Sequence, residues 1–70
     1  MMQGKVKWFN ENRGYGFIRQ EDGKNIYVHY SDIVGEGFRT LSENENVEYE
    51  LEEKFKGIQA VRVKKINQVK

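Results

Sequence analysis

Two short segments of this chain place flat aromatic rings on alternate positions. They are Arg13-Gly14-Tyr15-Gly16-Phe17-Ile18 and Ile26-Tyr27-Val28-His29. In an extended strand the side chains alternate between two faces, so Tyr15 and Phe17 share one face of the first segment. In the second segment, Tyr27 and His29 do the same. Asp22-Gly23 between the segments is typical of a hairpin turn. We therefore expect the four rings to lie side by side.

A surface of flat rings can stack on the bases of a single nucleic-acid strand, whose faces a duplex would cover. Such stacking contributes about 1–3 kcal/mol per base and depends little on sequence. The same strands carry separate apolar residues (Ile18, Ile26, Val28) that can fill a core, so we expect the rings to face outward. Basic residues that could meet phosphates lie among the rings: Lys5, Lys7 and Arg13.

Residues for catalysis or metal binding do not form a recognisable set. His29 is the only histidine and there is no cysteine, so we expect no metal site built from these ligands. Glu48, Glu50 and Glu52 could be paired acids, but their alternation is explained more simply by a solvated strand face. We expect no catalytic residue, no enzyme activity, no metal and no cofactor.

The length and composition predict one small domain that spans residues 1–70. No run is long and apolar enough to cross a bilayer, and residues 1–10 lack the apolar centre of a signal peptide. Without cysteine, a reducing cytoplasm is the natural setting. We expect a cytoplasmic monomer with no membrane partner and no small-molecule substrate.

The net charge of +1 is distributed unevenly along the chain. Residues 1–30 carry five Lys/Arg against three acids, residues 31–53 carry one against eight, and residues 54–70 carry six against none. One interpretation is that one side of the molecule accepts a polyanion and another repels it. The other is that the acidic segment pairs with the basic last strand, so that their charges largely neutralise one another.

Alternating apolar and polar residues predict five short strands, at about 3–10, 15–20, 25 to 29 or 30, 47–52 and 59–64. We expect residues 31–33 to form one helical turn anchored by Ile33, and residues 42–45 to form a turn. In the fourth strand, Val47, Tyr49 and Leu51 form the buried face. Ile66 and Val69 are out of phase with the last strand, so the last few residues should leave the barrel. Five strands without a convincing helix predict an all-β, closed or nearly closed antiparallel barrel.

Two aromatic positions have alternative interpretations. Alternation fails at Trp8-Phe9, where either one ring points inward and the other outward, or a bulge brings both towards the surface. Phe38 follows Gly35 and Gly37 on a loop, where it could cover the open end of the core or contact a ligand.

The chain resembles the bacterial cold-shock proteins over essentially its whole length. The residues that carry the resemblance are Gly4-Lys5-Val6-Lys7-Trp8-Phe9-Asn10, Arg13 to Ile18, Ile26-Tyr27-Val28-His29-Tyr30-Ser31 and Gly37-Phe38. The resemblance implies a five-stranded barrel of the oligonucleotide-binding (OB-fold) type that binds single-stranded RNA and DNA and acts as an RNA chaperone or cold-shock regulator. The contact residues it implies are Lys7, Trp8, Phe9, Arg13, Tyr15, Phe17, Tyr27, His29, Tyr30, Phe38 and Lys56, to which the interleaved charge adds Lys5.

Five positions depart from residues common in that family. They are Arg13 for lysine, Asn25 for aspartate, Tyr27 for phenylalanine, Asp32 for alanine and Ile58 for proline. Arg13 and Tyr27 keep the charge and the ring. The missing proline leaves open the shape of the loop before the last strand, and with it the role of Lys56.

Two other classes of protein share part of the pattern. The first segment matches the opening of the RNA recognition motif signature, but that fold needs two helices and has its second aromatic motif before the first. Small barrels with aromatic grooves also bind proline-rich peptides. The interleaved cations favour nucleic acid over a neutral peptide, and only nucleic-acid binding should weaken strongly as salt rises.

Overall fold

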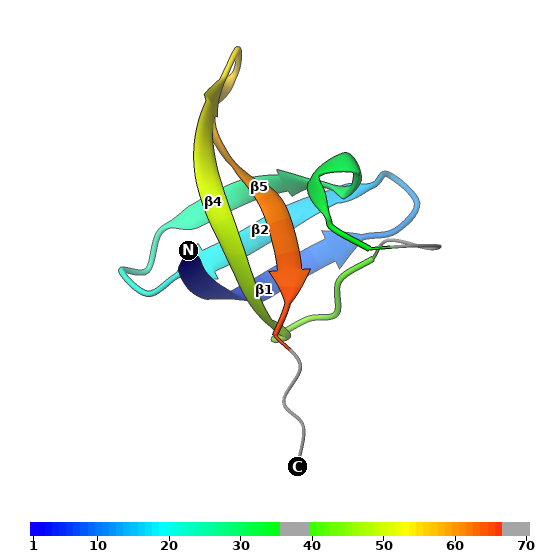
Figure 1. The fold of residues 1–70 in the computed structure, drawn as a ribbon. Helices are drawn as coiled ribbons and strands as arrows, with labels where there is room; N and C mark the ends of the chain where they lie inside the picture. Colours follow the sequence, from blue (N-terminus) through cyan, green and yellow to red (C-terminus); the bar gives the residue numbers. More distant parts are fainter. Residues whose placement is uncertain (36–39, 67–70) are drawn as a thin grey trace.

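The computed structural model describes residues 1–35 and 40–66, which form a five-stranded barrel (Figure 1). Its elements are β1 (Met2–Asn10), β2 (Tyr15–Gln20), β3 (Asn25–His29), the short 3-10 turn η1 (Tyr30–Asp32), β4 (Asn46–Lys54) and β5 (Gly57–Lys65). Around the closed barrel the strand order is β1-β2-β3-β5-β4. The predicted all-β class and barrel are confirmed, and each predicted strand is present with bounds that differ by a few residues.

One pair of neighbouring strands is parallel, which the expectation of a purely antiparallel barrel missed. β3 pairs with β5 in parallel at Tyr27–Gln59 and Val28–Ala60, whereas the other neighbours are antiparallel. The reason is geometric, because strand directions cannot alternate all the way round a closed ring with an odd number of members. The parallel contact is short, and it brings the first part of β5 beside β3.

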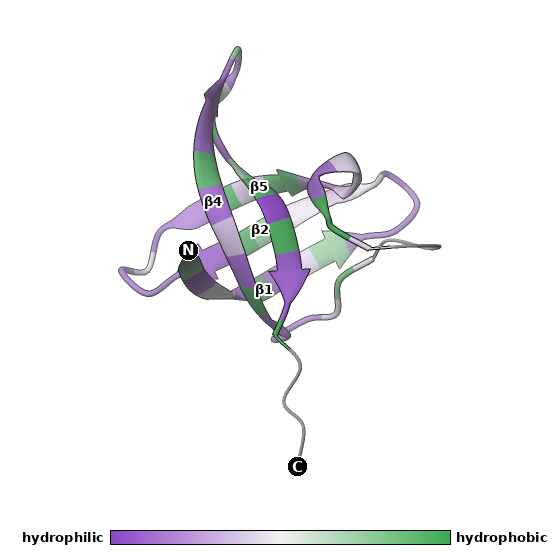
Figure 2. Cartoon of the chain, viewed as in Figure 1, coloured by the Kyte–Doolittle hydropathy of each residue, from purple (hydrophilic) through white to green (hydrophobic). Residues whose placement is uncertain are grey.

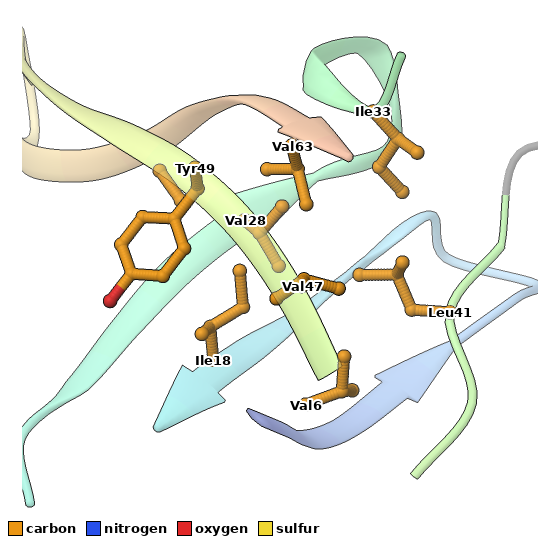
Figure 3. Packing of buried hydrophobic residues seen from close by; sticks show 9 residues of the cluster. Val6, Ile18, Val28, Ile33, Leu41, Val47, Tyr49 and Val63 are labelled. Atoms are coloured by element: carbon orange, nitrogen blue, oxygen red, sulfur yellow. The ribbon is translucent and has the colours of Figure 1, made fainter. Parts of the chain in front are cut away.

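The core takes one valine or isoleucine from every strand. Val6, Ile18, Val28, Val47 and Val63 are fully buried and point towards one another (Figure 3). Ile33, Leu41, Tyr49 and Ala60 complete the cluster. The alternating green and purple bands along β4 and β5 in Figure 2 reflect this division between core and solvent. Since these residues supply the core, the rings on the outer face of the sheet are not needed to fill it.

Leu51 does not belong to the core, contrary to the alternation in its segment. Its side chain is 37% exposed, and the following residues 52–58 are exposed as well. β1 pairs with β4 only as far as Tyr49, and β3 pairs with β5 only at Gln59 and Ala60. The outer parts of β4 and β5 therefore project beyond the barrel as a two-stranded hairpin (Figure 1), where Leu51 has no opposing sheet.

A shift in strand register changes the alternation in β5. The pairing with β4 shifts between Glu48 and Glu50, and Arg62 at this point has a positive φ of 50°. Val61 and Val63 are buried as predicted, while Ala60 is buried as well. The exposed Arg62 and Lys64 agree with the prediction.

Basic side chains of β5 pair with acidic side chains of β4 and of the turn before it. Arg62 Nε donates a hydrogen bond to Glu50 Oε1, and Lys65 Nζ lies 3.9 Å from Glu45 Oε2. Lys64 is directly opposite Glu48 in the strand ladder. This arrangement supports the second interpretation of the charge pattern, in which the acidic segment neutralises the last strand. Because these pairs are largely exposed, each contributes at most about 1 kcal/mol to stability.

The connections agree with most sequence expectations. Ile33 is buried directly after η1, and residues 42–45 form a turn in which the Glu45 N–H donates to the Ser42 carbonyl oxygen over 3.0 Å. Ile66 is a correction: its N–H donates to the Asn46 carbonyl oxygen, so the chain is still attached to β4 there. Val69 lies outside the described residues. No helix within residues 1–35 and 40–66 has the length and apolar character needed to cross a lipid bilayer.

Tyr49 links the core to the β2–β3 hairpin. Its hydroxyl donates to Gln20 Oε1 over 3.4 Å, and Gln20 Nε2 donates to Asp22 Oδ1 over 3.3 Å. Burial raises the pKa of the Tyr49 hydroxyl above its ordinary value of 10.0, and the charges of Asp22 and Glu21 raise it further. The folded state therefore favours the neutral form of the Tyr49 hydroxyl.

Candidate nucleic-acid interface

One extra residue in β1 decides which ring of the Trp8-Phe9 pair faces outward. Val6 pairs with Ile18 and Trp8 pairs with Phe17, so Lys7 is the extra residue of a β-bulge. After the bulge, Trp8 lies opposite Phe17 and is 37% exposed. Phe9 lies opposite Gly16 and packs, half-buried, against the core. The alternative with both rings outward is therefore wrong, and the bulge instead exposes Lys7 beside Trp8.

Two glycines let rings approach the backbone closely. A Cβ at Gly16 would lie 2.3 Å from the Trp8 carbonyl oxygen, 2.7 Å from Phe9 Cα and 2.8 Å from Phe9 Cδ1, so only glycine leaves room for the β1 backbone and the Phe9 ring. Gly14 ends the β1–β2 turn with a positive φ of 78°, and a Cβ there would lie 2.5 Å from Tyr30 Cδ2. Gly16 therefore seats the inward ring of Phe9, and Gly14 seats the outward ring of Tyr30.

The outer face of β1, β2 and β3 carries three rows of side chains. Strand register gives a middle row of Trp8, Phe17 and Tyr27, a row of Lys5, Arg19 and Asn25 on one side, and a row of Asn10, Tyr15 and His29 on the other. We call the five rings Trp8, Tyr15, Phe17, Tyr27 and His29 the aromatic face. A ladder of three strands thus places a strip of rings beside a strip of cations.

The rings of the aromatic face contact one another. The ring centroid of Phe17 lies 5.4 Å from that of Trp8 and 6.0 Å from that of Tyr27. Tyr15 is 5.5 Å from Trp8, and it stacks on Tyr27 at 5.8 Å with 27° between the planes. These separations are typical of favourable aromatic pairs, which contribute about 0.5–1.5 kcal/mol each. The prediction that the two ring pairs lie side by side is confirmed.

His29 and Tyr30 continue this surface at the start of η1. Their ring centroids are 4.7 Å apart, and Tyr30 is 47% exposed. The Ser31 N–H donates to His29 Nδ1 over 3.3 Å, and Ser31 Oγ lies 2.9 Å from the same nitrogen. With Nδ1 acting as an acceptor, a neutral imidazole carries its hydrogen on Nε2. Ser31 therefore holds the His29 ring in place.

Four exposed cations accompany the rings. Lys5, Lys7 and Arg13 were predicted, and Arg19 lies opposite Lys5 in the same ladder. None of the ion pairs found within residues 1–35 and 40–66 involves these four side chains. Sequence reasoning missed Arg19, although its spacing of two from Phe17 places both residues on the same strand face.

The remaining predicted contact residues lie elsewhere. Lys56 is exposed at the tip of the β4–β5 hairpin, outside the β1–β3 ladder, and lines a cleft together with Tyr27 and His29 of β3. Phe38 lies outside the described residues. For all the predicted residues, the structure gives their positions, and contact with nucleic acid stays a prediction.

Comparison with known proteins identifies the family. Residues 2–66 match the family model of the "Cold-shock" DNA-binding domain. The chain belongs to the cold-shock domain family. The family is one of nucleic-acid-binding domains, in agreement with the exposed rings and cations.

Two relatives of this cold-shock domain illustrate the similarity. The probable cold shock protein A of Mycolicibacterium smegmatis is 54% identical over 67 residues, which cover 94% of this chain and 100% of the relative. A cold shock-like protein of Thermotoga maritima is 52% identical over 63 residues, which cover 90% of this chain and 96% of the relative. Both matches span nearly the whole barrel.

A solved structure supports the fold of this cold-shock domain. The Drosophila Unr structure that contains cold-shock domains 4 to 6 superimposes with a TM-score of 0.76 at 25% identity. The match covers 94% of this chain and 26% of the other, so the chain spans about a quarter of that structure. The barrel is therefore of the oligonucleotide-binding type, as the sequence resemblance implies.

Proposed function

We propose that this protein binds single-stranded RNA and DNA by stacking unpaired bases on the aromatic face, and that it acts as an RNA chaperone or cold-shock regulator. The observation that carries the proposal is the middle row of Trp8, Phe17 and Tyr27, in which Trp8 is exposed and the other two rings are half-buried, with Lys5 and Arg19 in the row beside it. Rings in this arrangement accept successive bases, while the cations accept the phosphates between them.

The preference for single strands follows from the geometry of stacking. In a duplex, both faces of each base are already covered by its neighbours, so the aromatic face gains little from contact. A ligand that binds only the unpaired state shifts the pairing equilibrium towards that state by its differential affinity. The protein therefore opposes RNA hairpins by mass action, without ATP and without a chemical step.

The aromatic face is held in place before any ligand arrives. Its rings are on three paired strands, contact one another and are supported by Gly16 and by the Lys7 bulge. A rigid site loses less conformational entropy on binding than one built on a mobile loop. In this proposal the protein works as a cytoplasmic monomer without metal, cofactor or enzyme activity.

Fluorescence of Trp8, the only tryptophan, tests the proposal directly. The protein is titrated with a thymine-rich single strand, with the matching duplex and with a proline-rich peptide, each at low and high salt. We expect strong quenching by the single strand, little by the duplex and weaker affinity at high salt. Quenching by the duplex alone, or by neither nucleic acid, would overturn the proposal. Salt-independent binding of the peptide alone would assign the face to peptide recognition.

An RNA hairpin with a fluorophore and a quencher at its two ends then tests the chaperone role. Added protein should raise the fluorescence of the hairpin in proportion to the bound fraction, without ATP. Binding to single strands with no opening of hairpins would restrict the function to strand binding.

A further inference from the structure

The projecting hairpin carries a ring that does not contribute to the core. Residues 53–58 pair only with one another across the β4–β5 ladder, beyond the last contacts with β1 and β3. Phe55, at the tip, is fully exposed, and Ile58 is 55% exposed. A fully exposed phenylalanine gains nothing from burial in this fold. The Phe55 ring is therefore accessible to a ligand outside the barrel.

A cleft connects this hairpin to the aromatic face. Its volume is about 640 Å³, which is within the range of about 300–1,000 Å³ for small-molecule pockets. Tyr27 and His29 form part of one wall, and residues 54–58 of the hairpin form the other. A nucleic-acid strand that crosses Tyr27 and His29 on the aromatic face can therefore continue into the cleft.

The two walls of the cleft carry opposite charges, so a polyanion is favoured in one orientation only. Lys54 and Lys56 flank Phe55 on the hairpin, and Lys54 Nζ lies 3.3 Å from Glu52 Oε1. Asp32 is in the opposite wall, where its Oδ2 accepts a hydrogen bond from Gln59 Nε2 over 3.1 Å. Phosphates are favoured beside the lysines and disfavoured beside Asp32. A strand in the cleft therefore has its backbone towards the hairpin.

We infer that Phe55 is a further base-stacking residue, which receives a base next to those on Tyr27 and His29 and so lengthens the binding site along the hairpin. The ring between two cations repeats the combination found on the aromatic face, and the cleft joins the two surfaces. The family resemblance assigns only Lys56 on this hairpin. The inference rests on the proposed single-strand binding by the aromatic face.

The test compares thymine-rich strands of about four and about eight nucleotides, lengths within the range that one such barrel covers. Phe55→Ala should weaken binding of the longer strand by about fivefold or more, the lower end of the stacking range, and leave binding of the shorter strand unchanged. Leu51→Ala is the matched control, because it truncates an exposed apolar side chain on the same hairpin that does not line the cleft. This control should bind both strands as the unmodified protein does.

A tryptophan at the tip reports contact directly. In a Trp8→Phe background, Phe55→Trp places the only tryptophan on the hairpin, and the longer strand should quench its fluorescence while the shorter one does not. Unchanged affinity of Phe55→Ala for the longer strand, or an equal loss in Leu51→Ala, would overturn the inference. A dimer that sedimentation velocity shows to depend on Phe55, with strand affinity unchanged, would assign the ring to a second copy instead. Failure of the proposed function is distinct, because Trp8 of the unmodified protein would then respond to neither length.

Discussion

Replacing Arg19 by glutamine tests whether the cations beside the rings contact phosphates. Arg19 lies on the outer face of β2, opposite Lys5 and two residues along the strand from Phe17. Glutamine keeps a polar side chain and removes one positive charge. Because Arg19 is exposed, the substitution should change the free energy of unfolding by less than about 0.5 kcal/mol. A change in binding can therefore be assigned to the lost charge.

The expected size of the effect follows from counterion release. Each phosphate neutralised on a single strand adds about −0.7 to the slope of log affinity against log salt concentration. The four exposed cations, Lys5, Lys7, Arg13 and Arg19, together give a slope of about −2.8. Affinity should then fall about 50-fold between about 50 and about 200 mM salt. With Arg19→Gln the slope becomes about −2.1 and the fall about 18-fold.

The assay is Trp8 fluorescence titration with one single strand at several salt concentrations. Arg62→Gln is the matched control, because it removes the same charge from an exposed arginine on β5 whose Nε donates to Glu50. The slope of this control should stay at the value of the unmodified protein. The loss in Arg19→Gln should also be similar for strands of different sequence, since phosphate contacts carry no base information.

Two results would refute this reasoning. An unchanged slope in Arg19→Gln would show that the row of cations does not contact the strand. An equal reduction in Arg62→Gln would show that net charge acts at a distance, without a defined path for the phosphates.

Three further substitutions test the rings, a close contact and a buried hydroxyl. Phe17→Ala should weaken single-strand binding by about 1–3 kcal/mol, while its urea unfolding stays cooperative. The control Leu51→Ala should bind as the unmodified protein does. Global unfolding of Phe17→Ala would show that the Phe17 ring is part of the core. Gly16→Ala should lower the free energy of unfolding by about 1–3 kcal/mol or more, because its Cβ would clash with the β1 backbone at Trp8 and Phe9 as well as with the Phe9 ring, and an unchanged Tm would contradict this. Tyr49→Phe should cost about 1 kcal/mol at neutral pH through the lost hydrogen bond to Gln20. In the unmodified protein, the pKa of Tyr49 is higher in the folded state than in the unfolded state, whose tyrosine ionises at about pH 10. The contribution of Tyr49 to the free energy of unfolding is therefore complete below about pH 10 and is lost as the pH rises through the higher folded pKa. Urea unfolding above pH 10 should show a smaller loss in Tyr49→Phe, and equal losses in both proteins would refute the linkage.

Much of the fold could be predicted because its signals are local. Alternation of period two marks all five strands, and Asp22-Gly23 marks the β2–β3 turn. The same alternation was wrong for Leu51, because it reports which residues share a strand face and not how far the neighbouring strands extend. It also could not reveal the parallel β3–β5 contact, which follows from closing five strands into a ring.

The sequence by itself determined the ingredients of the candidate site. Tyr15, Phe17, Tyr27 and His29 share one face by spacing alone, and the apolar residues between them supply a core that leaves these rings outside. Only the tertiary structure decided the border of that surface. The bulge at Lys7 turned Trp8 outward and Phe9 inward, and the register brought Arg19 beside Lys5. The physical reason is that bulges and register are properties of two paired strands, so neither is written in the periodicity of one.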